Sequence, residues 1–408
     1  MVSFVTISGS SHDTISVGFD TKSNAILAEQ IAKNISAGVA AGTIVTASDA
    51  SGPPPPLPSS VSGVFVQTQS SLVVLPPGYS TDIVTKSGPA VVFGSGSPET
   101  ILSGAATDLT FIATSGSGTV IAGGGANRLS VSGSGSWLLN TGGGNDIVAA
   151  LGAVSATIAP GSGSNAILLG DGNDVVDSTG KDTITGGSGS ATINATGAVS
   201  DLVEGHASNL LFLGGGGGVT ILGGTGSDTY LGATGETHRQ LIEGGSAGNN
   251  FLFAGSGSAT LIGGGSGDQL FAYGAQHQLL VAGAGNETLS AAFSTGGDTL
   301  KAGSGKDLLI GGSGADTFVG GSGSATIQAG FSGNVFEFIN HQAGGTDLIQ
   351  GIFDPASIKI DLVGYGKGAI DNALHSQTVQ GGSVTIGLTD GTKITFQDVT
   401  KLDRSNFV

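Results

Sequence analysis

Residues 302–330 read AGSGKDLLIGGSGADTFVGGSGSATIQAG, which is three nine-residue units followed by Ala-Gly. Each unit keeps its glycines and an apolar eighth residue. The sixth residue differs, because it is Asp307 in the first unit, Asp316 in the second and Ala325 in the third. The backbone pattern of this repeat is therefore fixed, whereas its charged group is optional.

The composition of the chain limits its class. It has 408 residues, of which 76 are Gly and none is Cys. Glycine at this level without a strict three-residue period excludes a collagen-like triple helix. Val, Ile, Leu and Phe are plentiful and regularly placed, which argues against a disordered chain. The absence of cysteine excludes disulfide bonds and thiolate metal sites.

The charge balance restricts the partners. The formal net charge is −17, which disfavours nucleic acids and anionic membrane surfaces and suits a cation-binding or strongly solvated surface. No apolar run approaches the roughly 18 residues of a membrane span, so the sequence predicts no such span. Residues 1–25 lack a basic start followed by an apolar block, so we expect no ordinary cleaved signal peptide.

The nine-residue period extends far beyond the opening stretch. From residue 65 to residue 336, one apolar residue recurs at steps of mostly nine residues, within short β-branched runs such as AVVF and VTIL. Gly, Ser, Asn and Asp separate these runs and supply turns at low steric cost. A helix cannot form at this glycine density. The period predicts that one apolar residue per unit points into a core, including Phe65, Val74, Leu168, Leu241 and Phe336.

These features predict an all-β fold, a right-handed parallel β-solenoid of the β-roll or β-helix type. Two nine-residue units would form one coil, and successive coils would stack at roughly 4.8 Å. We expect three regions: an N-terminal segment over 1–60 with one short helix and a Pro-rich arm, the solenoid over 61–340, and a C-terminal β cap with a secretion signal over 341–408.

Several units also carry a family resemblance. GGTGSDTYL (223–231), AGSGKDLLI and GGSGADTFV match the pattern G-G-x-G-x-D-x-U-x of the repeats-in-toxin (RTX) group, and TGGGNDIVA (141–149) and LGDGNDVVD (169–177) match it except at the first glycine. The chain resembles the calcium-binding β-roll proteins that Gram-negative bacteria secrete. The resemblance implies Ca²⁺ as the cofactor, held between two turns on the same side of the roll. Turn carbonyls and one aspartate from each turn would be its ligands.

An acid is a candidate calcium ligand if an acidic partner lies two units away. Asp298 and Asp316 meet this condition and are the strongest pair. Asp307 has Ala325 downstream, and upstream it has Glu287 across a two-residue insertion. The predicted metal ligands are Asp298, Asp316, Asp307, Glu287, Asp228 and Asp268.

Two of these acids have weaker partners. Asp228 has only Ser246 downstream, and Asp268 pairs loosely with Glu287. A second interpretation stays open for every such aspartate, since an aspartate in a glycine-rich turn also caps the turn through its own backbone. Where the sixth residue is neutral, as at Ala325, turns can stack without an ion because no carboxylates repel each other.

The two ends of the chain differ from the repeat. We expect Ser23 to cap a helix that runs to about Ala37, and the first residues to form short strands. Residues 51–58, SGPPPPLP, form either a stiff linker or an extended arm lying on the solenoid.

The C-terminal part carries two further predictions. Residues 345–366 resemble the segment that closes the roll in RTX proteins, and residues 384–396 predict a hairpin with Asp390 and Gly391 at its turn. The resemblance also implies an uncleaved C-terminal secretion signal read by a one-step (type I) export machine. We therefore expect an extracellular or cell-surface location on a Gram-negative bacterium.

No constellation of catalytic residues is visible. The six histidines are scattered and form no H-E-x-x-H motif. The match of residues 244–248 to G-x-S-x-G is expected by chance in Gly- and Ser-rich turns. With 13 Lys and Arg in the whole chain, no cluster of acids and bases indicates a lyase or an epimerase. We therefore expect no enzyme activity.

The ninth residue of several units is apolar although it should face outward. These residues are Leu222, Leu231, Ile262, Phe271, Ile310 and Val319. Exposed apolar rows mark a contact surface, unless the N-terminal arm or the C-terminal cap covers them. The sequence favours a secreted, calcium-binding structural protein that self-assembles as a homo-oligomer, filament, sheet or surface layer. The alternative is an extracellular adhesin or glycan-binding module with a cell-surface glycan as its partner.

Overall fold

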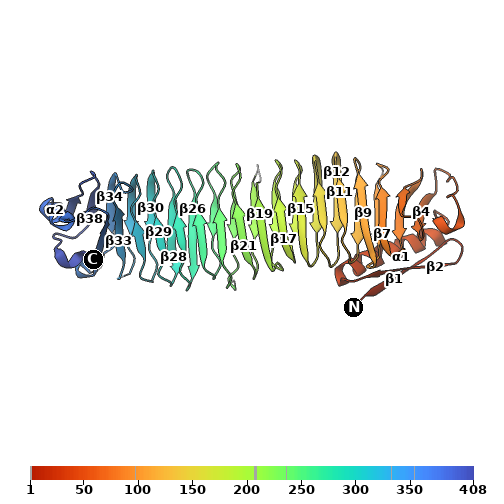
Figure 1. Cartoon of the computed structure of the whole chain (residues 1–408), viewed down its shortest axis with the longest axis horizontal. Coiled ribbons are helices and arrows are strands. Elements are labelled where there is room, and N and C mark those ends of the chain that lie inside the picture. Colours follow the sequence, from red (N-terminus) through yellow and green to blue (C-terminus); the bar gives the residue numbers. More distant parts are fainter. Residues whose placement is uncertain (1, 97, 206–208, 236, 332, 353) are drawn as a thin grey trace. The chain divides into compact units, whose positions relative to one another are not determined.

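The computed structural model describes residues 2–96, 98–205, 209–235, 237–331, 333–352 and 354–408. The chain divides into two compact units, residues 1–208 and residues 209–408. Figure 1 shows the elements in chain order, and each unit is built mainly from short strands.

The first unit contains the following elements in chain order: β1 (Ser3–Ser8), β2 (Thr14–Phe19), α1 (Lys22–Ala40), β3 (Ile44–Ser48), η1 (Asp49–Ser51), β4 (Ser62–Gln67), β5 (Leu72–Val74), β6 (Tyr79–Val84), β7 (Gly88–Phe93), β8 (Glu99–Ser103), β9 (Thr107–Ala113), β10 (Gly118–Ala122), β11 (Arg128–Val131), β12 (Ser134–Asn140), β13 (Ile147–Ala150), β14 (Ala153–Ala159), β15 (Ser164–Leu169), β16 (Asp174–Asp177), β17 (Lys181–Thr185), β18 (Ala191–Asn194) and β19 (Ser200–Glu204).

Strands of the first unit form two parallel sheets. The even-numbered sheet runs from β4 through every second strand to β18, with β3 beside β4 at its start. The odd-numbered sheet runs in the same way from β5 to β19. Because consecutive strands alternate between the two sheets, the chain winds as a parallel β-solenoid with one strand of each sheet per coil.

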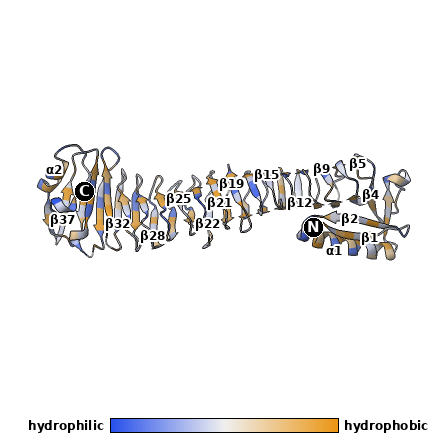
Figure 2. Ribbon diagram, turned by 60° about the horizontal axis from the view of Figure 1, so that its bottom comes forward, coloured by the Kyte–Doolittle hydropathy of each residue, from blue (hydrophilic) through white to orange (hydrophobic). Residues whose placement is uncertain are grey.

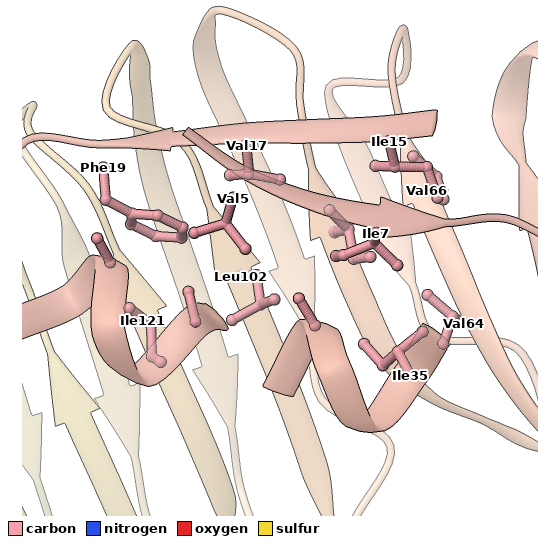
Figure 3. Packing of buried hydrophobic residues seen from close by; sticks show 14 residues of the cluster. Val5, Ile7, Ile15, Val17, Phe19, Ile35, Val64, Val66, Leu102 and Ile121 are labelled. Atoms are coloured by element: carbon pink, nitrogen blue, oxygen red, sulfur yellow. The ribbon is translucent and has the colours of Figure 1, made fainter. Parts of the chain in front are cut away.

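The outer face of the even-numbered sheet is covered at the start of the first unit. β1 and β2 form an antiparallel hairpin, and α1 lies beside them against the first coils (Figure 2). Apolar side chains of the helix and hairpin pack on Val64, Val66, Ile83, Leu102 and Ile121 of β4 to β10 (Figure 3). We call α1, β1 and β2 the N-terminal cover.

The cover is fixed by polar contacts at the start of α1. Thr21, rather than the expected Ser23, caps the helix, because its hydroxyl accepts the N–H of Asn24 at 3.3 Å. The buried Asn24 side chain donates to the carbonyls of Ala122 and Thr141 at 2.8 and 2.9 Å. One amide thus ties the helix to two successive coils.

The Pro-rich segment lies on the solenoid and is not a free linker. Its flanking strands β3 and β4 are neighbours in one sheet. The hydroxyl of Tyr79 donates to the carbonyl of Pro55 at 3.1 Å. Of the two alternatives left open by the sequence, the structure therefore shows the arm.

The second unit contains the following elements in chain order: β20 (Leu210–Leu213), β21 (Gly218–Leu222), β22 (Thr229–Leu231), β23 (Gln240–Glu243), β24 (Phe251–Phe253), β25 (Ala259–Ile262), β26 (Gln269–Gly274), β27 (Leu279–Val281), β28 (Thr288–Ser294), β29 (Thr299–Lys301), β30 (Lys306–Ile310), β31 (Thr317–Val319), β32 (Ser324–Gln328), β33 (Val335–Ile339), β34 (Thr346–Gln350), η2 (Pro355–Ser357), β35 (Lys359–Val363), α2 (Ala369–His375), β36 (Thr378–Gln380), β37 (Ser383–Gly387), β38 (Lys393–Phe396) and η3 (Arg404–Asn406).

The second unit repeats the two-sheet arrangement and ends in a cap. Its even-numbered sheet runs from β20 to β34, and its odd-numbered sheet runs from β21 to β35. The predicted hairpin is present as antiparallel β37 and β38, and β38 also pairs in parallel with β34. Phe396 of β38 packs edge-on against Phe336, with 6.0 Å between the ring centroids. The predicted solenoid, N-terminal helix and C-terminal β cap are confirmed.

Parallel pairing extends on both sides of the 61–340 interval expected from the sequence. It begins with β3, before the Pro-rich arm, and it includes β34, β35 and β38. At the C-terminus, the N–H of Val408 donates to the carbonyl of Ile360 at 3.0 Å, so the last residues pack on β35.

The apolar side chains that fill the interior recur as regularly as the sequence predicted. Some of the residues that were expected among them lie on the outer face instead. Ile101 and Val120 lie opposite each other in β8 and β10 and are fully buried. Val74, Leu168 and Leu241, which were expected inside, are instead 61%, 42% and 38% exposed. Their units contain adjacent apolar residues, and because strand side chains alternate, an offset of one residue reverses the face.

Glycine is required in the turns because the backbones of successive coils touch there. A Cβ atom at Gly314 would lie 1.8 Å from the carbonyl oxygen of Gly296. A Cβ atom at Gly323 would lie 2.0 Å from the carbonyl oxygen of Gly305. Gly323 belongs to the unit whose sixth residue is Ala325, so the glycine is kept for a reason that is independent of the charge.

Candidate calcium sites in the repeat turns

The sixth residue of the unit is buried at the corner where a turn enters a strand. Asp298, Asp307 and Asp316 are 1%, 3% and 1% exposed, and Glu287 is 2% exposed. Each side chain lies on the same side of its strand as the buried apolar residue two positions later. We call the stacked sixth residues of one sheet its corner row.

The corner row of the odd-numbered sheet brings the strongest predicted pair together. The N–H of Gln278 donates to Oδ1 of Asp298 at 2.8 Å, and the N–H of Asp298 donates to Oδ1 of Asp316 at 2.9 Å. The N–H of Asp316 donates in turn to Oδ1 of Asn334 at 2.8 Å. Each side chain therefore receives the N–H of the preceding coil and extends the backbone hydrogen bonding of the sheet into its corner.

The second carboxylate oxygen closes the residue's own turn. Oδ2 of Asp316 accepts the N–H of Gly312 at 2.7 Å, and Oδ2 of Asp307 accepts the N–H of Gly303 at 2.7 Å. Both oxygens of these two aspartates are therefore occupied by backbone donors. This is the capping role that the sequence left open.

The corner row of the even-numbered sheet holds three acids in succession. Asn250 donates its N–H to Oδ1 of Asp268 at 2.8 Å, and Glu287 donates its N–H to Oδ1 of Asp307 at 3.0 Å. The register of β26 and β28 places Asp268 and Glu287 in neighbouring coils. Both carboxylate oxygens of Glu287 are buried without a hydrogen-bond partner among the described residues.

Asp228 has a different neighbour from the one expected. The sequence paired it with Ser246, but its N–H donates to Oδ1 of Asn250, 22 residues later, at 2.7 Å. The strand register agrees, because Thr229 lies opposite Phe251. The pairing with Ser246 is therefore wrong, since the intervening coil is four residues longer than two units.

Burial and like charges disfavour ionisation of these groups. Burial raises the pKa of Asp298 to about 6, and the nearby charge of Asp316 adds to this. Burial also raises the pKa of Asp316. The pKa of Glu287 lies well above its usual range because the group is buried and because Asp307 and Asp268 carry like charges beside it.

Ala325 shows how a coil manages without its own carboxylate. Its N–H donates to Oδ1 of Asp347 in the next coil at 2.7 Å, so the corner bond is still made. Asp347 is fully buried, and its Oδ2 has no hydrogen-bond partner in the part of the chain that the structure describes. Burial raises its pKa to about 7. Sequence reasoning missed this residue because it lies 22 residues after Ala325, outside the nonapeptide register.

A similar row lies in the first unit, and none of its residues was among the predicted metal ligands. Asn127 donates its N–H to Asp146, Asp146 to Asn165, and Asp182 to Asp201, at 2.7, 2.9 and 3.3 Å. The side-chain amide of Asn165 donates to Oδ1 of Asp182 at 2.7 Å. The amide thus separates two acids along the row, whereas Asp182 and Asp201 are direct neighbours. The sequence signals for this row were the near match of 141–149, which contains Asp146, and an Asn or Asp before each short strand.

The corner rows fit a calcium ion at some positions better than at others. Ca²⁺ takes six to eight oxygen ligands, and Glu287 offers two buried oxygens without partners while Asp298 offers its Oδ2. Asp316 and Asp307 have both oxygens engaged with backbone N–H groups. Among the described residues no three His, Cys, Asp or Glu side chains gather in a way that could hold a metal, so backbone carbonyls would have to complete the ligand set.

Comparison with known proteins bears directly on these turns. Residues 161–193, 244–274 and 294–327 match the RTX calcium-binding nonapeptide repeat (4 copies). Calcium is the cofactor of such repeats, and the matched segments include Asp268, Asp298, Asp307 and Asp316. A comparison with curated proteins finds no match. The matched repeats and the parallel β-solenoid on which they lie together fit an RTX-type β-roll protein.

Proposed function

We propose that this protein is an extracellular structural protein whose coils are fastened by calcium and which self-assembles at a cell surface or in extracellular matrix. Proteins with RTX repeats are typically secreted, and their β-solenoids are typical of non-enzymatic structural proteins. No helix in the described ranges is long and apolar enough to cross a membrane. The observation that carries the proposal is the two corner rows of buried acids, in which Glu287 of the even-numbered row and Asp298 of the odd-numbered row keep carboxylate oxygens without partners.

The acids of the corner rows would have two different roles, binding the metal and orienting the turn backbone. Glu287 of the even-numbered row and Asp298 of the odd-numbered row would each hold an ion through their unpartnered oxygens. Asp307 and Asp316 would orient the turn backbone, since each accepts two N–H groups. Asp268 and Asp228 would extend the even-numbered corner row. A bound cation would favour the ionised form of Glu287 and Asp298, whose pKa values burial raises.

Calcium titration of the chelator-treated protein tests the calcium part of this proposal. We expect heat of binding in calorimetry and a higher unfolding temperature, because a ligand that binds only the folded chain stabilises it. The double substitution Asp298→Asn and Glu287→Gln should remove much of both effects. The matched control Glu243→Gln removes an exposed acid of β23 and should change neither. A calcium response that the double variant leaves intact would exclude these two ligands.

Negative-stain electron microscopy tests the assembly part. Filaments or sheets that form in calcium and disperse after chelation would support a calcium-dependent structural role. Assemblies that are indifferent to chelation would show that the neutral turns suffice. Single particles under both conditions would contradict self-assembly.

We also propose that residues 341–408 carry a C-terminal signal for one-step (type I) export from a Gram-negative cell. The proposal rests on the resemblance of the repeats to secreted RTX proteins. A reporter protein fused to residues 341–408 should appear in the medium of a host that has such an export machine. Retention of the fusion, with export of the full-length chain, would place the signal elsewhere.

One observation favours a glycan-binding role as the second candidate. A cavity of about 460 Å³ in the first unit is lined largely by hydroxyl groups, including Ser11, Thr14, Thr46, Ser48 and Thr68. Hydroxyl side chains both donate and accept hydrogen bonds, as sugar recognition requires. Binding on a glycan array that Thr46→Val abolishes would support this candidate, and an array without signal would count against it.

A further inference from the structure

The outer face of the even-numbered sheet in the second unit carries a cluster of aromatic rings. Its members are Phe251 and Phe253 of β24, Phe271 and Tyr273 of β26, and Phe293 of β28. Ring centroids lie 5.2 Å apart for Phe251 and Phe271, 5.6 Å for Phe253 and Tyr273, and 6.5 Å for Phe271 and Phe293. We call these five residues the aromatic patch.

The patch points outward and is not part of the solenoid interior. The interior positions between its members are Leu252, Leu270 and Leu289, which are fully buried. Phe293 is 59% exposed, and the other four rings are half-buried against one another. The sheet register places the outer residues of β24, β26 and β28 side by side.

The patch lies on a part of the sheet that has no charge. Strands β20, β22, β24, β26 and β28 read LLFL, TYL, FLF, QLFAYG and TLSAAFS, without a single Asp, Glu, Lys or Arg. The odd-numbered sheet of the same unit differs, because Glu243, Lys301 and Glu337 lie in its strands. The outward apolar residues that the sequence analysis named are therefore divided between the two sheets. Leu231 and Phe271 lie on the charge-free part of the even-numbered sheet.

The first unit shows what happens to an apolar stretch of the same kind of sheet. There the outer residues Val64, Ile83 and Leu102 are buried under the N-terminal cover. In the second unit the outer residues of β22 to β26 are half-buried or exposed, with Leu231 at 39%, and Phe293 of β28 is also exposed. A covered face is therefore already part of the architecture, and the aromatic patch is a face of the same kind without a cover from its own unit in the described residues.

We propose that the aromatic patch binds the same patch of a second copy of this chain, with the two sheets packed face to face. The formal net charge of −17 makes two copies repel each other, so they can approach closely only through a surface that carries no charge. Two sheets with apolar faces pack about 10 Å apart with interdigitating side chains. This inference rests on the self-assembly proposed above and names its interface.

Other partners suit the patch less well. An anionic membrane needs basic residues beside the apolar ones, and β20 to β28 contain none. A sugar needs a flat ring face with hydrogen-bonding groups around it, but the rings of Phe253 and Tyr273 are tilted by 41° and those of Phe271 and Phe293 by 47°. The tilted rings instead form a rough apolar surface into which side chains of a second copy can fit.

The geometry also predicts the size and symmetry of the contact. The five charge-free strands β20 to β28 of this sheet, at roughly 4.8 Å spacing, span about 24 Å. A contact of this width lies at the lower end of the sizes known for specific protein interfaces. We therefore expect a weak, concentration-dependent dimer. A contact between identical patches closes on itself, so a filament would need a second contact elsewhere on the chain.

Analytical ultracentrifugation of the full chain in calcium tests the proposal. The wild type should dimerise as its concentration rises, and Phe293→Lys should weaken the dimer by roughly tenfold or more. Phe293→Ser, which adds no charge, should weaken it less. The matched control Leu241→Lys places the same charge on an exposed residue of the odd-numbered sheet and should leave the dimer unchanged. Circular dichroism would verify that each variant is folded.

Other outcomes would overturn either this interface alone or the proposed self-assembly as a whole. A wild type that stays monomeric at high concentration would overturn both this interface and the proposed self-assembly. Association that Phe293→Lys and Phe293→Ser leave unchanged would exclude this face while self-assembly stands. A monomer that binds phosphatidylcholine vesicles or an insoluble polysaccharide through Phe293 would give the patch another occupant.

Discussion

The side chain of the sixth residue of the nonapeptide links successive coils by hydrogen bonds that need no metal. In Asp316 one carboxylate oxygen accepts the N–H of Asp298 and the other accepts the N–H of Gly312. An alanine can replace the aspartate when the next coil supplies the acceptor, as Asp347 does for Ala325. The N–H of a sixth residue needs only an acceptor from the following coil. The sixth residue itself can therefore lack a carboxylate, as Ala325 does.

Substitution of Asp316 separates the capping role from the calcium role. Asp316→Ala leaves two buried N–H groups without acceptors, and we expect it to lower the free energy of unfolding by about 2–5 kcal/mol in chelator. Asp316→Asn keeps one acceptor and should cost about half as much. Chemical denaturation measures both, with the exposed Glu243→Ala as control. Equal stability of Asp316→Ala and the wild type would contradict the capping role.

The buried Asp82 should make stability depend on pH. It is fully buried between Phe65 and Ile101, and neither carboxylate oxygen has a hydrogen-bond partner in the described residues. Burial, together with the charge of Asp49, raises its pKa from 3.8 to about 8. The folded chain therefore holds a proton that the unfolded chain has lost between about pH 4 and pH 8, so stability falls as pH rises through this window.

Asp82→Asn should remove the part of that pH dependence that Asp82 contributes. The amide does not titrate, so the unfolding free energy of the variant relative to the wild type should rise between pH 4 and pH 8 by an amount on the order of a few kcal/mol. Urea denaturation at a series of pH values measures the difference. Parallel pH profiles for the two proteins would show that Asp82 ionises normally in the fold.

At the scale of the element, the glycine turn limits the sequence more strictly than the strand does. Gly314→Ala would force a Cβ atom to within 1.8 Å of the Gly296 carbonyl oxygen, and we expect a loss of about 3 kcal/mol from the overpacked turn. Gly216→Ala is the matched control, because no atom lies within 4 Å of a Cβ atom added there. Thermal unfolding of the two variants distinguishes them. A Gly314→Ala protein as stable as the control would mean that the turns can move apart.

The N-terminal cover should stabilise the first coils. Ile35 of α1 is 4% exposed within the apolar cluster, so Ile35→Asp should cost about 3–5 kcal/mol through lost packing and a buried charge. Ile26 of the same helix is 56% exposed, and Ile26→Asp should change stability by less than about 0.5 kcal/mol. Hydrogen exchange of β4 to β10 reports the difference. Unchanged protection in Ile35→Asp would show that the coils do not depend on the cover.

At the scale of the whole molecule, chelation should act unevenly along the chain. The matched repeats at 244–274 and 294–327 flank Glu287 or contain Asp298, the two predicted ligands whose unpartnered oxygens would bind calcium. Residues 99–131 precede every matched repeat and carry no such pair of predicted ligands. We expect hydrogen exchange after chelation to rise in 244–327 and to stay unchanged in 99–131. A uniform rise along the chain would contradict local fastening by calcium.

The sequence predicted the period of the molecule better than its phase. A spacing of mostly nine residues was enough to infer the solenoid, because strand, turn and glycine all repeat together. It could not decide which of two adjacent apolar residues faces inward at Leu168 or Leu241, since both choices keep the spacing. The partner of Asp228 was missed because turn insertions accumulate in the count, whereas the strand register ignores them. Asp82 was missed because its burial depends on neighbours in two other coils.

The alternation of strands between two sheets has a consequence for how such a chain can change in length. A duplication of two units adds one complete coil, and every later side chain keeps its inward or outward direction and its corner partner. A duplication of one unit sends all later strands to the opposite sheet and would carry the aromatic patch with them. Viable relatives should therefore differ in length by whole coils, each adding roughly 4.8 Å. The length of such a molecule is therefore quantised, and its smallest step is one coil of two units.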